Sequence, residues 1–164
     1  MRIRNATEAD FERIVEIYNA SIPGRLATAD LTPVNAASRR AWFDAHKPET
    51  HPLIVAVNDD GAVMGWGSVS VFYGRIAYRH TAEISVYIAP EFGRRGVGAA
   101  LTREIIARCP GLQIKTLLAY IFGHNGPSIA LFEKFGFVKW GHLPNIADMD
   151  GVERDLVIYG LRVQ

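Results

Sequence analysis

The segment Gly93-Arg94-Arg95-Gly96-Val97-Gly98 follows an apolar stretch that ends at Pro90, and a helical pattern follows it. A helix that begins after a glycine turn presents unpaired N–H groups and the positive end of its dipole. Glycine lets a ligand approach that backbone closely, so phosphate or pyrophosphate is the natural guest. Arg94 and Arg95 add local positive charge. A tight strand-to-helix turn with solvated arginines explains the same residues, so the turn alone leaves both interpretations open.

Two common phosphate-binding motifs do not fit this turn. The chain contains no G-x-x-x-x-G-K-[ST] string, which a P-loop requires. A dinucleotide-binding fingerprint needs a third glycine, but that position holds Leu101, and residues 115–122 contain no acid to bind a ribose.

The surrounding elements indicate an α+β fold with a mixed, mostly antiparallel sheet of about seven strands and about four helices. Apolar residues from Phe11 to Tyr18 recur at helical spacing, and Thr7 is the expected N-cap of this helix. The last two strands are expected to be connected by a polar loop at 143–154. The predicted strands are Arg2–Asn5, Leu53–Val57, Ala62–Phe72, Thr81–Ile88, Thr116–Phe122, Phe137–His142 and Asp155–Arg162, and the other helices are Ser38–His46, Gly96–Arg108 and Pro127–Phe135.

The composition is that of an ordinary globular protein. The 164 residues are 49% hydrophobic and 21% charged, which suits a single domain over 1–164. A net charge of +1 gives no general field for nucleic acid or an anionic membrane. Cys109 is the only cysteine, which excludes an internal disulfide and a cysteine-rich zinc site. The first residues contain acids and no apolar core, so they do not resemble a signal peptide, and we expect a cytoplasmic protein. We also expect no bound metal.

Two segments resemble the GNAT N-acetyltransferase superfamily. Residues 83–105, EISVYIAPEFGRRGVGAALTREI, resemble its acetyl-CoA motif, a strand followed by Q/R-x-x-G-x-G/A and a helix, with Gly93 at the first position. Residues 125–141, NGPSIALFEKFGFVKWG, resemble a second family segment. The resemblance extends to the branch acting on phosphinothricin and methionine sulfoximine, through 17–22, 39–43 and 77–90. It implies that main-chain amides of Arg94, Arg95, Gly96, Val97, Gly98 and Ala99 hold the coenzyme A diphosphate.

The same resemblance implies roles along strand 81–88. Glu83 matches the glutamate proposed as general base in this branch, and it would also contact the acceptor amine. A strand carboxylate paired with Arg79 or His80 is the ordinary alternative. Main-chain groups of Val86, Tyr87 and Ile88 would pair with the pantetheine arm, and an N–H near Val86 or Tyr87 would stabilise the oxyanion.

Residues 125–134 supply further coenzyme contacts by resemblance. Asn125 and Ser128 match positions that hydrogen-bond the coenzyme arm, although Asn125 before Pro127 also makes a good helix start. Lys134 could approach the coenzyme phosphates, although a solvated helix lysine explains the same residue. Phe132 stands where many GNAT enzymes have tyrosine and cannot protonate the leaving thiolate. Water could then protonate the sulfur, or the thiolate could leave unaided, with Tyr120 as a distant reserve.

The acceptor side is expected between two strands, where four residues cluster: Phe72, Tyr73, Arg75 and Tyr78. Arg75 could bind a substrate carboxylate or phosphinate through two hydrogen bonds, although an ordinary surface arginine is the alternative. Segment 143–154 is expected to close one side of the site.

The resulting hypothesis is an acetyl-CoA-dependent N-acetyltransferase that acts on the α-amino group of a small amino-acid-like substrate by direct transfer in a ternary complex. A homodimer is expected from the branch. Two alternatives remain open: a polyamine, aminoglycoside or protein N-terminus as acceptor, or a coenzyme A sensor without turnover.

Overall fold

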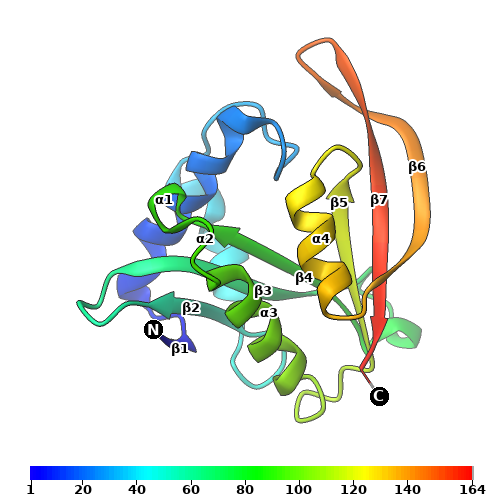
Figure 1. Ribbon diagram of the computed structural model, residues 1–164. Coiled ribbons are helices and arrows are strands. Elements are labelled where there is room, and N and C mark those ends of the chain that lie inside the picture. The colour runs from blue at the N-terminus through cyan, green and yellow to red at the C-terminus, as the bar shows by residue number, and fades with distance from the viewer. Residues whose placement is uncertain (164) are drawn as a thin grey trace.

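A seven-stranded sheet forms the centre of the computed structural model, which describes residues 1–163 (Figure 1). The strand order is β1-β2-β3-β4-β5-β7-β6, and every neighbouring pair is antiparallel except β4 and β5. The strands are β1 Arg2–Asn5, β2 Leu53–Val57, β3 Val63–Val71, β4 Thr81–Ile88, β5 Thr116–Phe122, β6 Val138–Met149 and β7 Val152–Arg162. The helices are α1 Phe11–Ser21, α2 Ala36–Ala45, α3 Val97–Arg108 and α4 Gly126–Lys134, with 3-10 turns η1 Glu8–Asp10, η2 Ile22–Gly24, η3 Ile76–Tyr78 and η4 Pro90–Phe92. The predicted α+β fold is confirmed.

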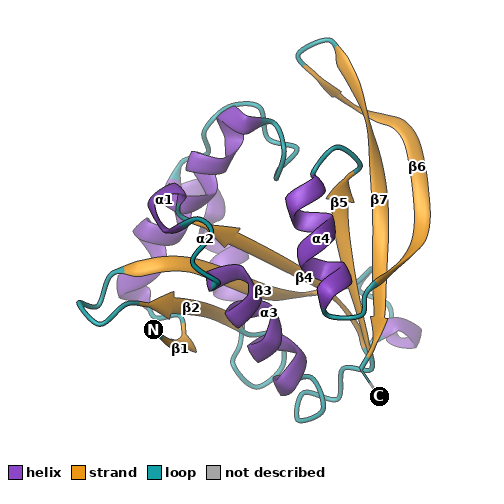
Figure 2. Cartoon of the chain, viewed as in Figure 1, coloured by secondary structure: helices purple, strands orange, loops and turns teal. Residues whose placement is uncertain are grey.

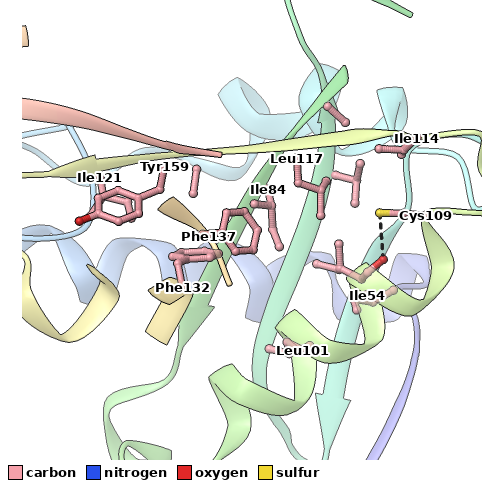
Figure 3. Packing of buried hydrophobic residues seen from close by; sticks show 14 of the residues in the cluster. Ile54, Ile84, Leu101, Cys109, Ile114, Leu117, Ile121, Phe132, Phe137 and Tyr159 are labelled. Carbon is pink, nitrogen blue, oxygen red and sulfur yellow. Dashed lines mark hydrogen bonds between the residues drawn. The ribbon is translucent and has the colours of Figure 1, made fainter. Parts of the chain in front are cut away.

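Helices cover both faces of the sheet, which explains why β2 is apolar throughout (Figure 2). Successive side chains of a strand point to opposite faces. Ile54 of β2 therefore packs in the core with Leu101 of α3, whereas Val55 packs with Ile14 of α1. Figure 3 shows the first of these cores, where Phe132 of α4 lies beside the strand side chains.

The N-terminal cap is confirmed, with one 3-10 turn between the cap and α1. The Thr7 N–H donates to Asp10 Oδ2 over 2.7 Å, and the Arg4 guanidinium donates to both Asp10 oxygens. Asp10 is only 5% exposed, so these bonds compensate for its burial. The arrangement fixes β1 against the start of α1.

The expected loop at 143–154 is wrong: β6 runs to Met149 and β7 begins at Val152, so most of this segment is a paired hairpin (orange and red in Figure 1). Asp150 and Gly151 make its tight turn with positive φ, and Asp148 Oδ1 accepts the Gly151 N–H. The outer half of the hairpin is largely exposed, so its strands carry polar residues and lack the alternation that marks a half-buried strand. A register shift between Leu143 and Ala147 further hides the pattern.

Candidate active site

The sheet splits at Glu83. The parallel pairing of β4 with β5 covers only Thr81–Glu83 against Thr116–Leu118, although β4 continues to Ile88. Beyond Glu83 the two strands diverge from a common base (Figure 1), and β5 keeps its other neighbour, β7, along its whole length.

The backbone of β4 beyond the split has free hydrogen-bonding groups on one side. Residues of an antiparallel strand alternate between those that bond the partner and those that point away from it. The Ala89 N–H donates to Met64 O at 2.9 Å, which sets the phase: odd-numbered residues of β4 bond to β3. The N–H and C=O groups of Val86 and Ile88 therefore face the gap together with the C=O of Ile84, whereas the parallel pairing of Glu83 with Leu118 engages the Ile84 N–H.

The gap is a cavity of about 230 Å³, which we call the split-strand cavity. A segment distant in sequence covers it: Asn125 Nδ2 donates to Leu26 O at 3.0 Å, and His124 Nε2 lies 2.7 Å from Arg25 O. The Arg25 side chain also pairs with Asp150 at the tip of the β6–β7 hairpin, at 2.7 Å. The lining residues are Leu26, Ala27, Ile84, Ser85, Val86, Tyr87, Ile88, Tyr120, Ile121, Phe122, Asn125, Pro127, Ser128, Leu131 and Phe132.

The glycine turn lies next to this cavity. Gly96 caps α3 with φ +77°, and a Cβ added there would meet no atom within 4 Å. Within the described chain, the amides of residues 97–99 have no backbone acceptor, and the first helical bond runs from Ala100 N–H to Gly96 O. At Gly98 an added Cβ would lie 3.3 Å from Leu131 Cδ2 and 3.8 Å from Ile88 Cδ1, two residues of the cavity wall. The turn therefore presents unpaired donors beside the open backbone of β4.

The Glu83 side chain lies on the face of β4 opposite to the side chains of Ile84 and Val86. It is half-buried, and burial raises the pKa of its carboxyl. It has no hydrogen bond or ion pair to any described side chain, including Arg79 and His80. A carboxylate in this state can accept a proton near neutral pH more readily than a solvated one.

Glu83 lines a second cavity of about 300 Å³, which we call the Glu83 cavity. Ser85 and Tyr87 line both cavities, so the two hollows meet where β4 has lost its partner. The Glu83 cavity is lined by Tyr18, Arg39, Trp42, Trp66, Ser68, Ser70, Glu83, Ser85 and Tyr87. The arrangement can hold two molecules on the two sides of one strand, with a carboxyl group and free backbone donors between them.

Comparison with known proteins agrees with this geometry. The model of the acetyltransferase (GNAT) family matches residues 11–137. The chain belongs to the GNAT acetyltransferase family. It is 48% identical over 160 residues to YwnH of Bacillus subtilis, provisionally named a phosphinothricin acetyltransferase, covering 98% of both chains. It is 32% identical to the L-methionine sulfoximine/L-methionine sulfone acetyltransferase of Pseudomonas paraeruginosa, covering 98% of this chain and 94% of the relative.

A solved relative carries the coenzyme. The phosphinothricin acetyltransferase of Sinorhizobium meliloti, in complex with AcCoA, superimposes with a TM-score of 0.92 at 33% identity, over 98% of this chain and 87% of that one. The chain is therefore a GNAT N-acetyltransferase, and GNAT acetyltransferases use acetyl-CoA. Within residues 1–163 no cluster of His, Cys, Asp and Glu could hold a metal ion, and no helix is long and apolar enough to cross a membrane.

The residues expected to bind the coenzyme fall into three groups. Val86, Tyr87, Ile88, Asn125 and Ser128 line the split-strand cavity. Residues 94–99 form the adjoining turn, where neither Arg94 nor Arg95 has an ion-pair partner in the part of the chain described. Lys134 is exposed at the end of α4 and lines neither cavity.

Asn125 has the structural role that its position suggested. Its Oδ1 accepts the Ser128 N–H at 3.2 Å and caps α4, while its Nδ2 holds the covering segment. Both ends of the amide are thus engaged, and the side chain is 9% exposed. Asn125 thus shapes the cavity wall, and its contact with the coenzyme stays a prediction.

Apart from Glu83, the residues expected to bind the acceptor line neither of these cavities. Phe72, Arg75 and Tyr78 line a separate hollow of about 420 Å³, and the Tyr73 ring packs against Phe72 and Tyr78. This hollow shares no lining residue with the Glu83 cavity. Their role in acceptor binding stays a prediction.

Phe132 is 4% exposed, lines the split-strand cavity and packs its ring 5.0 Å from that of Phe137. It contributes an apolar wall. Tyr120 lines the same cavity, and its pKa is raised by burial and by the charge of Glu83. Its hydroxyl therefore keeps its proton at neutral pH.

Sequence reasoning missed the wall of the Glu83 cavity contributed by Tyr18, Arg39 and Trp42. These residues belong to α1 and α2, which are remote from β4 in sequence. The Tyr18 hydroxyl is hydrogen-bonded to Thr28 and Asp30, which fixes the segment after α1 over this side of the sheet. The local pattern marked Tyr18 and Trp42 only as apolar helix residues.

Proposed function

We propose that the protein transfers the acetyl group of acetyl-CoA to the α-amino group of a small amino-acid-like substrate, of the class of methionine sulfoximine, methionine sulfone or phosphinothricin. The observation that carries the proposal is the split at Glu83, with a cavity on each face of β4. Relatives named for these substrates support the choice of acceptor class.

The split-strand cavity suits the coenzyme. Its wall offers the unpaired backbone of Val86 and Ile88, and the amides of the turn at Gly96 are free beside it. These groups would hold the pantetheine arm and the diphosphate respectively. When bound, acetyl-CoA supplies an activated acetyl thioester.

The chain's own groups have separate tasks. The Glu83 carboxylate would accept a proton from the acceptor ammonium, which makes the amine nucleophilic. The Val86 N–H faces the gap and would donate a hydrogen bond to an oxygen that develops negative charge there. Phe132 has no proton to give, so solvent would protonate the thiolate or it would leave unaided, with Tyr120 of the same cavity as a reserve donor. No nucleophilic side chain is needed, because the two substrates meet directly.

An assay of free thiol release tests this proposal with acetyl-CoA and a panel of amines: methionine sulfoximine, methionine sulfone, phosphinothricin, ordinary amino acids and polyamines. Turnover that is fastest with the first three supports the proposal. Turnover that is fastest with polyamines refutes the acceptor class. Binding of acetyl-CoA without release of coenzyme A in the presence of any of these amines would identify a sensor instead.

We also propose that the protein forms a homodimer through its edge strand β6. Val138, Trp140 and Ile146 of β6 are 57%, 49% and 55% exposed, and an exposed apolar edge strand invites pairing. Light scattering after size exclusion should give twice the 18.2 kDa chain mass. A monomer at micromolar concentration would contradict the proposal.

A further inference from the structure

Arg39 lies on the wall of the Glu83 cavity without a counter-charge. Its guanidinium carbon lies 4.3 Å from the centre of the Trp42 ring and 4.6 Å from that of the Tyr18 ring. It makes no hydrogen bond or ion pair with any residue of the described chain. Asp30, a nearby acid, is bonded to the Tyr18 hydroxyl instead.

The neighbouring arginine shows what a purely structural guanidinium looks like in this helix. Arg40 also stacks on rings, those of Phe11 and Phe43, at 4.0 and 5.4 Å. Its nitrogens pair with Glu8 at 2.6 Å and Asp44 at 3.3 Å. Arg40 thus has its charge satisfied, whereas Arg39 does not.

Stacking uses the faces of a guanidinium and leaves its edge of N–H donors free. That edge matches a carboxylate, which can accept two parallel hydrogen bonds. The rings also fix the side chain, so little conformational entropy remains to be lost when an anion binds. A held, half-buried and unpaired guanidinium is therefore a ready anion site.

The opposite charge lies in the same cavity. Glu83 also has no partner, and no ion pair joins it to Arg39 although both line one hollow. His46 is hydrogen-bonded to Ser70 of the same cavity, and burial chiefly lowers its pKa, which favours the neutral imidazole. The described lining thus offers one positive and one negative group that are not paired with each other, so a bound molecule can interact with both.

We infer that Arg39 binds the α-carboxylate of the acceptor while Glu83 receives its ammonium, so that the Glu83 cavity selects zwitterionic amino acids. The inference rests on the proposed function and names its specificity determinant. A volume of about 300 Å³ is sufficient for a small amino acid. The second ammonium of a polyamine would meet the positive charge of Arg39 and be rejected.

The test compares methionine sulfone with its decarboxylated analogue, 3-(methylsulfonyl)propan-1-amine. For the wild type, kcat/KM should be about 100-fold higher with the amino acid, since one charge-assisted pair of hydrogen bonds is lost with the analogue. Arg39→Met should lower kcat/KM for methionine sulfone about 100-fold, mainly through KM, and leave the analogue unchanged or improved. Arg39→Lys should restore part of the loss, and the control Arg40→Met should preserve the preference.

Several results would overturn the inference. Equal losses for both compounds in Arg39→Met would show a packing role only. Loss of the preference in Arg75→Met, with Arg39→Met unaffected, would move the carboxylate site to the hollow beside β3. A wild type that acetylates both compounds equally well would remain an N-acetyltransferase while the carboxylate site fails.

A binding measurement covers the case in which neither compound is acetylated. Calorimetry of methionine sulfone with the coenzyme A-bound protein should then show affinity that Arg39→Met abolishes. Such a result would support the site although the proposed function had failed, and absence of binding to the wild type would reject both.

Discussion

Glu83→Gln separates the proton-accepting role of this residue from any structural one. The substitution keeps the shape of the side chain and removes its ability to take a proton. Because a general base typically contributes at least 10²-fold, kcat should fall about 100-fold at pH 8, which corresponds to about 2.7 kcal/mol in the activation barrier. Affinity for acetyl-CoA should change little, because Glu83 lines the other cavity.

The pH dependence follows from burial. Since burial raises the pKa of Glu83, the wild-type kcat/KM should fall tenfold per pH unit below that pKa. The Gln variant should lack this limb, so the ratio between the two enzymes should shrink toward unity as the pH falls. A steady-state thiol-release assay over pH 5–9 measures both profiles.

Stability supplies an internal control. A carboxyl whose pKa is raised on folding stabilises the native state fully below its unfolded pKa of about 4.3, and this contribution is lost as the pH rises through the folded value. Glu83→Gln should therefore unfold at a temperature equal to or above that of the wild type at pH 8, and the difference should vanish near pH 4.

Wild-type turnover of Glu83→Gln across pH 6–9 would show that Glu83 is not the base. Loss of activity together with thermal stability at pH 8 would show a structural carboxylate. Glu12→Gln, on the exposed face of α1, is the matched control and should leave both profiles unchanged.

Three further substitutions test the cofactor turn and the framework. Gly96→Val should abolish coenzyme A binding in calorimetry, whereas Gly61→Val, which has a similar φ of +84° and equally open surroundings, should cost comparable stability and leave binding intact. Asp10→Asn should lower the free energy of unfolding by about 2 kcal/mol at neutral pH. Burial opposes ionisation of Asp10, but the hydrogen bonds from Arg4 and Thr7 outweigh it and lower the pKa of Asp10. The stability difference should therefore diminish toward pH 3. Gly65→Ala should cost about 1–3 kcal/mol, because the new Cβ would lie 2.7 Å from a backbone oxygen of β4.

Each of these has a clear contrary result. Normal coenzyme affinity in Gly96→Val would place the diphosphate elsewhere, and equal binding losses in both glycine variants would indicate general misfolding. A destabilisation of Asp10→Asn that is independent of pH would show that the charge is unimportant. A wild-type melting temperature in Gly65→Ala would mean that β4 can shift freely beside the split.

The local features of this protein could be predicted from its sequence, because they depend on residues that are close together in the chain. The glycine turn before α3, the caps at Thr7 and Asn125, and the alternation along β4 all arise from interactions within a few positions. The outer part of β6–β7 was missed for the same reason, since a strand exposed on both faces lacks the alternation that burial imposes.

The site itself was decided by tertiary structure. The residues near Glu83 in the sequence do not indicate that β5 separates from β4 there, because this pairing depends on a strand more than thirty positions away. Likewise, Arg39 shares a cavity with Glu83 only because α2 packs on the same side of the sheet as α1. The residue types in the sequence thus predicted which side chains are able to react. Only long-range packing determined which of them share a cavity and which charges remain unpaired there.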